Sequence, residues 1–219
     1  MERQCDFINE VHLTGQIKHI HRNFEKRVAG IEVATYGGHP NYPEVLCLGD
    51  HFADADTVAV GDWVKITACV QTRRKRIQEG DSFRTDYRQG LVLTNIEKTE
   101  SIGEKYFGQN AENGLYDTQN LVVLTGTVNS FKALGNRAQL TLYCMNGKYR
   151  DLIMVAFFTQ DAKEFVSQFE KGDWVNVVAR VQTTSASKSN TGHKKESLVG
   201  ARINKVADAP SVKEDGNEK

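Results

Sequence analysis

The amino-acid sequence predicts an all-β protein with short helices, built as two tandem five-stranded Greek-key barrels. The first observation is an internal repeat: GDWVKITACVQT at 61–72 returns as GDWVNVVARVQT at 172–183. The second is that NEVHLTGQI at 9–17 returns as NLVVLTGTV at 120–128, again with a spacing of 111 residues. Two separated matches at one spacing indicate that the chain carries two copies of one domain.

The third observation is the alternation of apolar and polar residues, which has the period of a β-strand. In the first copy the apolar positions of the repeated stretch are Val64, Ile66, Ala68 and Val70, and residues 175–181 repeat the pattern. Such alternation predicts strands with one buried face. The first strand of each copy contains a glycine, Gly15 or Gly126, where we expect the chain to bend or bulge.

The second and third strands follow in the same order in both copies. Ile31 and Val33 predict the second strand of copy one, and residues 140–144 that of copy two. DLIMVAFF at 151–158 predicts a third strand, with EVLCLG at 44–49 as its weaker counterpart.

A helix and a final strand complete each copy. Residues 159–173 space apolar side chains as a helix does and contain a glycine near their end. A long polar loop precedes the last strand, LVLTNIEK at 91–98 or LVGARINK at 198–205. The resulting order, β-β-β-α-β-β with a bulged first strand, predicts the five-stranded OB barrel.

The repeat also predicts the domain boundaries. We expect a degenerate first barrel at 1–98 and a second barrel at 120–206, joined by a linker at 99–119. Residues 207–219 are rich in charge and predict a disordered tail.

Composition and apolar runs favour a globular protein over a disordered chain or a membrane protein. Hydrophobic residues make up 39% of the chain and charged residues 26%, which is ordinary globular usage. No apolar run approaches the length of a membrane span, and the N-terminus lacks the apolar core of a signal peptide. We therefore expect a cytoplasmic protein without membrane contacts.

Catalytic and metal-binding patterns find no support in the sequence. The four cysteines are far apart, and none belongs to a CxxC motif, so we expect buried thiols rather than a zinc site or disulfides. His19 and His21 share one face of the first strand but have no third ligand beside them. No nucleophile–base order or phosphate-binding glycine loop appears. The sequence predicts a binding module without a cofactor rather than an enzyme.

Two stretches of the second copy carry family motifs, NLVVLTGTV at 120–128 and FFTQDAKEFVSQFEKGDWVNVVARVQT at 157–183. The first resembles the opening strand, and the second another motif, of the OB domains of the bacterial single-stranded-DNA-binding proteins. The matching positions are Phe158, Ala162, Lys171, Gly172, Asp173, Ala179, Arg180, Val181, Gln182 and Thr183. The resemblance implies single-stranded DNA as the ligand, and for a chain with two barrels it implies a homodimer.

The two copies differ in charge. Single-strand binding needs a basic groove for phosphates and flat side chains on which bases stack. Residues 120–206 hold 12 Lys and Arg against 6 Asp and Glu, a net +6, whereas residues 1–98 hold 13 against 14, a net −1. The second barrel is therefore the electrostatic candidate for nucleic-acid binding.

Phe158 is the first candidate for base stacking in the second barrel, because the resemblance directs its face of the third strand toward DNA. The alternative is that Phe158 fills the core. Tyr143 is opposite in phase to Leu142 on strand two and should also face outward. Trp63 and Trp174 begin strands and are expected to be packing residues, and Leu152 stands where the family commonly has a stacking tryptophan. The other candidates are Leu152, Met154, Lys132, Lys148, Arg150, Arg180, Lys194, Lys195 and Lys18.

The loop before the last strand of the first copy is strongly basic. Its candidate contacts to nucleic acid are Arg73, Arg74, Lys75, Arg76, Arg84, Tyr87 and Arg88. Such a run predicts a flexible basic arm that closes over a nucleic-acid strand. A solvated hairpin is the alternative, because Glu79, Asp81 and Asp86 partly neutralise the charge.

These features together predict sequence-tolerant binding and protection of single-stranded DNA during replication, recombination or repair, in a host, a phage or a mobile element. Replication or recombination proteins are the expected partners. Two alternatives stay open. The chain could be an adaptor subunit of a replication or transfer complex, whose first barrel docks protein, or an OB protein that binds RNA or oligosaccharide.

Overall fold

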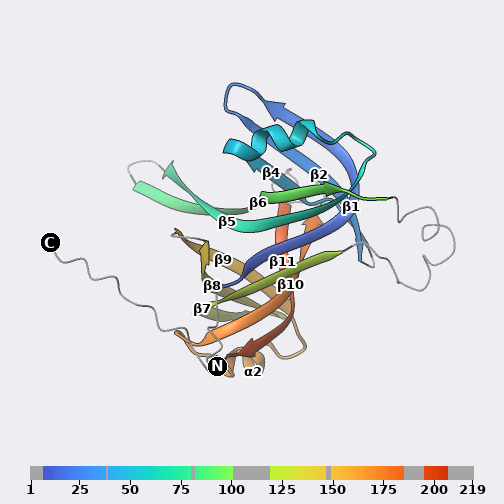
Figure 1. Cartoon of the computed structure of the whole chain (residues 1–219). Coiled ribbons are helices and arrows are strands. Elements are labelled where there is room, and N and C mark those ends of the chain that lie inside the picture. The colour runs from blue at the N-terminus through green and yellow to red at the C-terminus, as the bar shows by residue number, and fades with distance from the viewer. Residues whose placement is uncertain are drawn as a thin grey trace, which may run out of the picture.

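The computed structural model describes residues 7–37, 39–79, 82–100, 119–146, 149–184 and 195–206. The first barrel is made of β1 (Asn9–Asn23), β2 (Val28–Gly37), β4 (Glu44–Leu48), β5 (Trp63–Glu79) and β6 (Ser82–Lys98), and β3 (His39–Asn41) pairs with β2. The second is made of β7 (Asn120–Leu134), β8 (Arg137–Asn146), β9 (Tyr149–Phe158), β10 (Trp174–Thr184) and β11 (Lys195–Lys205). Figure 1 shows the two barrels one above the other.

Each barrel is a closed ring of five strands. In the first, β1 pairs with β5 and β2, and the ring continues through β6 and β4. In the second, β7 pairs with β10 and β8, and the ring continues through β11 and β9. Within each ring only the pairing of the third strand with the last is parallel. This is the OB order, so the predicted fold class is confirmed.

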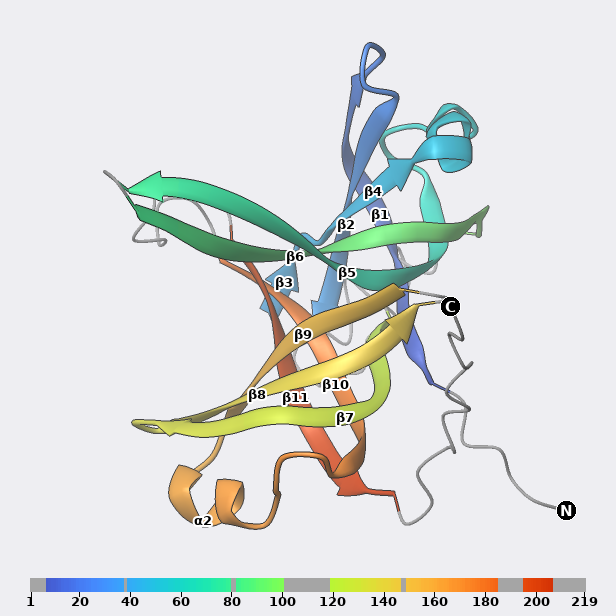
Figure 2. The same ribbon diagram turned by 90° about the vertical axis from the view of Figure 1, so that its left-hand side faces the viewer.

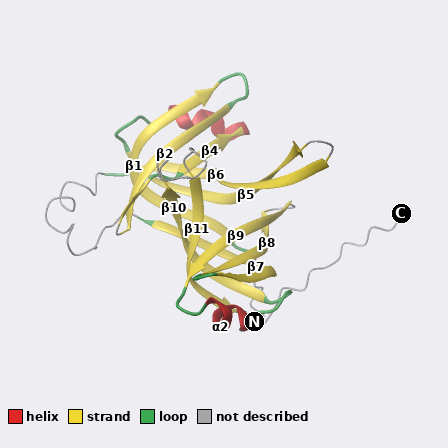
Figure 3. Ribbon diagram, turned by 180° about the vertical axis from the view of Figure 1, so that it is seen from behind, coloured by secondary structure: helices red, strands yellow, loops and turns green. Residues whose placement is uncertain are grey.

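A short helix lies between the third and fourth strands of each barrel, at opposite ends of the molecule in Figure 3. In the second barrel this is α2 (Ala162–Ser167), which confirms the predicted helix; the Asp161 side chain caps it by accepting from two backbone N–H groups. The corresponding segment of the first barrel is the 3₁₀ helix η1 (Gly49–Asp56). In the part of the chain that the structure describes, no helix is long and apolar enough to cross a membrane.

The glycine of each first strand allows a close approach between strands. A Cβ atom on Gly15 would lie 2.1 Å from the Ala34 carbonyl oxygen, and one on Gly126 would lie 2.2 Å from that of Tyr143. Just beyond each glycine the register with the second strand becomes irregular. The predicted bend is therefore confirmed, because only glycine lets these strands curl tightly enough to close the ring.

The two barrels share one continuous eleven-stranded sheet, because β1 pairs antiparallel with β7 around Val11 and Val122. Thr14 N–H donates to the Gln119 carbonyl (2.8 Å), and Thr125 N–H donates to the Ile8 carbonyl (2.7 Å). These bonds join equivalent positions of the repeat, so the barrels are related by an approximate two-fold axis. Of the predicted linker 99–119 and tail 207–219, all but residues 99, 100 and 119 lies outside the described residues.

Burial follows the predicted alternation. Val64, Ile66, Ala68 and Val70 are buried, as are their counterparts on β10. Trp63 and Trp174 are buried too, which confirms that they are packing residues. Cys47, Cys69 and Cys144 are buried, and none of these three forms a disulfide; Cys5 lies outside the described residues. Burial raises the pKa of the Cys47 and Cys144 thiols to about 12, so neither is a thiolate near neutral pH.

The basic loop of the first copy is a two-stranded ribbon. β5 and β6 stay in antiparallel register from the barrel out to Glu79 opposite Ser82. The predicted loop was therefore wrong, because these residues form a hairpin; a flexible arm that closes over a nucleic-acid strand stays a prediction. Branched and aromatic residues such as Ile77, Phe83 and Tyr87 favour extended pairing despite the charge around them. Figure 2 shows the ribbon projecting beyond the first barrel, above β9 and β8 of the second.

Candidate nucleic-acid interface

The outer surface of β8 and β9 in the second barrel carries the predicted stacking residue. Along β9, Ile153, Val155 and Phe157 are buried, whereas the alternate residues face outward. Phe158 ends this outward row and is 63% exposed. The predicted strand phase is confirmed, and Phe158 does not fill the core.

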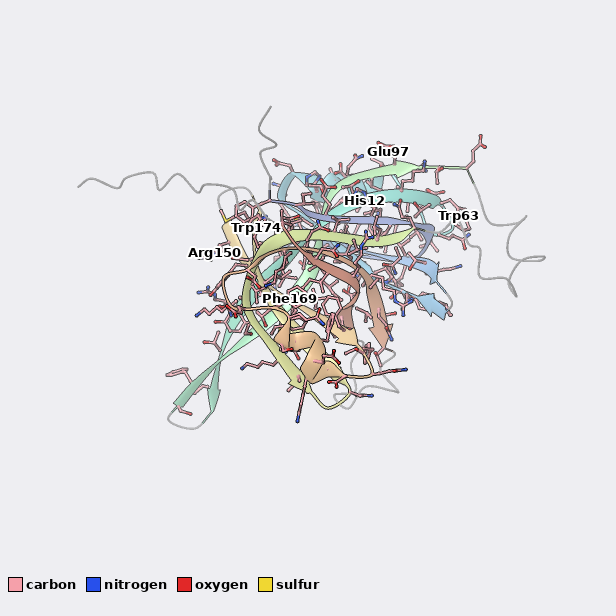
Figure 4. All side chains as sticks on the ribbon, turned by 90° about the horizontal axis from the view of Figure 1, so that it is seen from below. His12, Trp63, Glu97, Arg150, Phe169 and Trp174 are labelled. Carbon is pink, nitrogen blue, oxygen red and sulfur yellow. The ribbon has the colours of Figure 1, made fainter. Side chains whose placement is uncertain are left out.

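Tyr143 and Arg150 form a second flat platform on this surface. The Arg150 guanidinium lies 3.8 Å from the centroid of the Tyr143 ring, a cation–π contact. Tyr143 is half-buried and stands opposite Leu152 in the strand register. In Figure 4 Arg150 lies at the edge of the molecule, on the side from which the ribbon extends. The pair presents a planar, cationic surface that suits both a base and a phosphate.

The charge of this surface is positive. Among the outward positions that the structure describes on β8 and β9, none is Asp or Glu. Arg137 stands opposite Phe158 in the register, and exposed Lys132 of β7 stands opposite Gln139. Between these basic residues, Leu152 and Met154 are half-buried and apolar. We call the outward face of β8 and β9, with Lys132, the second-barrel face.

The root of the ribbon is hydrogen-bonded to β9. Thr72 and Gln89 are register partners on β5 and β6. Thr72 N–H donates to Asp151 Oδ1 (2.8 Å), and its hydroxyl donates to the Leu152 carbonyl (2.8 Å). The Gln89 side chain donates to the Met154 carbonyl (3.1 Å) and accepts from Met154 N–H (2.9 Å). These bonds fix the ribbon beside the second-barrel face.

Alternation assigns the basic ribbon residues to two sides. The side chains of Thr72 and Gln89 point toward β9, so Arg74 and Tyr87, two positions farther out, share that side. The Arg74 guanidinium lies 5.8 Å from the Tyr87 ring centroid. Arg73 and Arg88, which pair in register one position from the root, point to the opposite side.

Not every predicted residue joins this site. Exposed Lys18 lies on β1 of the first barrel, and exposed Arg180 lies on β10, which β11 separates from β9. Lys148 and Lys194 lie outside the described residues, and so do the side chains of Lys75, Arg76, Arg84 and Lys195.

Sequence reasoning missed the residues that join the barrels: Thr72, Gln89 and Asp151. A signal for two of them was present, because Thr72 recurs as Thr183 in the repeated QT, and Gln89 aligns with Glu196 at the spacing of 107 residues that relates the last strands. Both copies use these positions for contacts between barrels. Thr183 N–H donates to Asn41 Oδ1 (3.1 Å), and Glu196 Oε1 accepts from Glu44 N–H (2.6 Å).

The equivalent face of the first barrel has different chemistry. The strand registers place Glu44 where the second barrel has Met154, Glu32 where it has Thr141 and Leu48 where it has Phe158. His21 occupies the position of Lys132, and its Nε2 lies 3.2 Å from Glu44 Oε1. We call these positions the first-barrel face. The described residues contain no group of three side chains suited to a metal ion, either here or beside the His19–His21 pair.

Two closed OB rings with one basic, aromatic outer face define the class: the chain is a tandem OB-fold protein. No protein-family model matches it, and no curated protein matches it in sequence. The crystal structure of wild-type single-stranded DNA binding protein from Thermus aquaticus is similar, with a TM-score of 0.64 and 14% identity, over 94% of this chain and 97% of that one. A deletion mutant of that protein gives a TM-score of 0.60 and 16% identity, over 94% and 98%. The fold implied by the sequence resemblance is thus confirmed across both barrels.

Proposed function

We propose that this protein binds single-stranded DNA without strong sequence preference, on the second-barrel face and the adjoining side of the β5–β6 ribbon. The observation that carries the proposal is Phe158, an aromatic ring left 63% exposed on a face whose described outward residues include no Asp or Glu. A flat ring exposed beside basic side chains offers a surface on which a base can stack. The proteins of similar fold from Thermus aquaticus are named for binding single-stranded DNA.

The geometry supports a nucleic-acid strand as that ligand. Phe158 and the Tyr143–Arg150 pair offer two stacking platforms on one surface, and stacking tolerates any base because every base has a flat face. Arg137 and Lys132 lie beside the first platform, and Arg74 of the ribbon faces the same side. Cations placed along both platforms suit a phosphate backbone that passes over them.

The first-barrel face favours a different role. Glu32 and Glu44 would repel phosphates, and Leu48 replaces the stacking phenylalanine. We propose that this barrel contributes to DNA binding through its ribbon. The first-barrel face is then available to a protein partner. This agrees with one part of the adaptor alternative, in which the first barrel docks protein. We further propose that the protein acts in the cytoplasm, in DNA replication, recombination or repair.

Titration of fluorescent oligo-dT, oligo-U and duplex DNA at two salt concentrations tests this function. We expect oligo-dT to bind more tightly than the duplex, and its affinity to fall as salt rises because Lys and Arg displace counterions from phosphates. Equal affinity for duplex DNA would refute single-strand binding. Tighter binding of oligo-U would redirect the proposal to RNA.

We also propose that the chain forms a homodimer, so that four barrels act together. Linked barrels raise the local concentration of binding sites for one strand and increase affinity without new contacts. Light scattering at micromolar concentration tests this assembly. A mass of 24.5 kDa would correspond to the monomer and would exclude the dimer, whereas about twice that mass would support it.

A further inference from the structure

We propose that Gln89 is a positioning residue for DNA binding: it holds the basic ribbon of the first barrel against β9 of the second, although it does not contact DNA itself. This inference rests on the proposed function. It adds that the two barrels form one composite site, whose affinity depends on hydrogen bonds between the barrels.

The Gln89 side chain forms hydrogen bonds with the backbone of β9, as the backbone of a neighbouring strand would. Its carboxamide donates to the Met154 carbonyl (3.1 Å) and accepts from Met154 N–H (2.9 Å), so it satisfies both backbone groups of one residue. β9 has room for this contact because its parallel pairing with β11 is limited to two residue pairs, at Val155 and Ala156. Backbone groups outside that short ladder need another partner.

Thr72 reinforces the same attachment from the other strand of the ribbon. It donates from its N–H to Asp151 Oδ1 and from its hydroxyl to the Leu152 carbonyl, both at 2.8 Å. Asp151 is only 8% exposed, so the carboxylate is dedicated to a contact inside the protein. Since Thr72 and Gln89 stand opposite each other, one cross-strand pair anchors the whole ribbon.

The anchor determines which side of the ribbon faces the second barrel. Arg74 and Tyr87 follow Thr72 and Gln89 on that side, whereas Arg73 points away from it. Loss of the anchor would let the ribbon move without removing any of its charges. Arg74 and Tyr87 would then no longer be held over a strand bound to the second-barrel face.

The matching contact on the other side of the approximate two-fold axis provides a control. Glu196 stands where Gln89 does, and its Oε1 accepts from Glu44 N–H (2.6 Å). A carboxylate cannot donate to the Glu44 carbonyl, so this contact satisfies one backbone group where Gln89 satisfies two. It also anchors β11 to the first-barrel face, where we propose no DNA contact.

The test is a double-mutant cycle on oligo-dT affinity with full-length Gln89→Ala, Arg74→Ala and the double variant. We expect each single change to weaken binding about three- to tenfold, and the double variant to lose little more than either single change. Arg74→Ala should also lower the slope of log affinity against log salt by about one. The same reduced slope is expected for Gln89→Ala, although that change removes no charge.

Two matched variants serve as controls. Arg73→Ala removes the same charge from the opposite side of the ribbon, and Glu196→Ala removes the equivalent contact from the other barrel; both should change affinity less than twofold. If Gln89→Ala unfolds, Gln89→Met replaces it. That variant keeps the length of the side chain, adds no charge and loses both hydrogen bonds to Met154, so the same loss of affinity and the same reduced slope are expected.

The outcomes separate the two proposals. If the unmodified chain does not prefer single strands, the proposed function fails and this inference fails with it. If the unmodified chain binds and Arg74→Ala weakens binding, but Gln89→Ala does not, the inference alone is wrong. Additive losses from Gln89→Ala and Arg74→Ala would also overturn it, because Gln89 would then act by some route other than the ribbon.

Discussion

The two barrels share one fold but present opposite chemistry on equivalent outer faces. The second-barrel face exposes Phe158 and has basic side chains around an apolar centre. The first-barrel face has Leu48 in place of that ring and carries Glu32 and Glu44. The first barrel carries basic residues on the β5–β6 ribbon, whose root is hydrogen-bonded to β9 of the second barrel. Under the proposed function, the duplicated domain divides one binding site between its copies, one supplying the stacking surface and the other a charged arm.

The cores of the two barrels differ in a compensating way. In the second barrel, Phe157 fills the space beside Gly200, where a Cβ atom would lie 2.2 Å from the ring. In the first barrel the same two positions are Cys47 and Leu93, both buried. A large and a small residue have exchanged strands, and the volume of the core is kept. The outer faces therefore differ although both barrels fill this core position with one larger and one smaller residue.

The largest expected effect comes from exchanging these core pairs. Phe157→Cys should lower the free energy of unfolding by about 3 kcal/mol, because it leaves a cavity beside Phe131 and Phe165. Gly200→Leu should cost roughly 1–3 kcal/mol, because the new side chain meets the Phe157 ring. The double variant should recover much of the loss. Urea unfolding of the three variants measures this, and additive losses would show that the pairs are not equivalent.

Removal of the exposed ring is the next effect in size. Phe158→Ala should weaken binding of oligo-dT by roughly 1–3 kcal/mol, the contribution of one stacked base. The unfolding transition should not change, because the ring is 63% exposed. Leu48→Ala, the matched change in the first barrel, should leave DNA affinity unaltered. Equal losses from both variants would mean that both faces bind DNA.

Adding a carboxylate to the second-barrel face tests whether charge separates the two faces. Met154→Glu gives the second-barrel face the carboxylate that the first barrel has at Glu44. Repulsion of phosphates should weaken oligo-dT binding about tenfold at low salt and less at high salt. Met154→Gln, similar in shape and neutral, is the control. Equal affinity of the two variants would place the DNA elsewhere.

The smallest effect concerns a feature that both barrels keep. Hydrogen bonding to Lys98 holds the pKa of Asp62 below its ordinary 3.8, and the Glu170 N–H and Lys205 do the same for Asp173. A depressed pKa means that each carboxylate stabilises the fold above pH 3.8, and that this stabilisation is lost as the pH falls through the folded-state value. Asp62→Asn and Asp173→Asn should therefore each lower stability slightly at pH 7, and the difference from the unmodified chain should shrink in acid. Thermal unfolding across pH tests this, and unequal effects would show that the two turns have diverged.

The sequence predicted the features that local patterns determine. The repeat and the alternation predicted both barrels and the helix before β10, and the family resemblance predicted the outward direction of Phe158. The acidic first-barrel face was missed, because its residues align with the second barrel at other spacings: Glu44 and Met154 are 110 residues apart, and Glu32 and Thr141 are 109 apart. Hairpins of different length shifted the register, so the exact repeat did not reveal these pairs.

The attachment of the ribbon could not be predicted, for a different reason. Gln89 meets Met154, and Thr72 meets Asp151, only because β1 pairs with β7, and the recurrence of these positions in both copies does not indicate how the barrels are placed. The ribbon itself was expected to be a loop because charge dominates its composition. Cross-strand pairing of Ile77, Phe83 and Tyr87 with their neighbours is a non-local property that composition does not record.

Photocrosslinking to an oligonucleotide that carries iodouracil tests the central claim most directly, because it identifies the aromatic side chains that bases stack on. We expect the crosslinked peptides from the intact protein to contain Phe158, Tyr143 and Tyr87, with Phe158 dominant. Tyr42, an exposed aromatic residue that precedes β4 of the first-barrel face, should not react. Crosslinking confined to Tyr42, or divided equally between the two barrels, would contradict a single site shared between the second-barrel face and the ribbon.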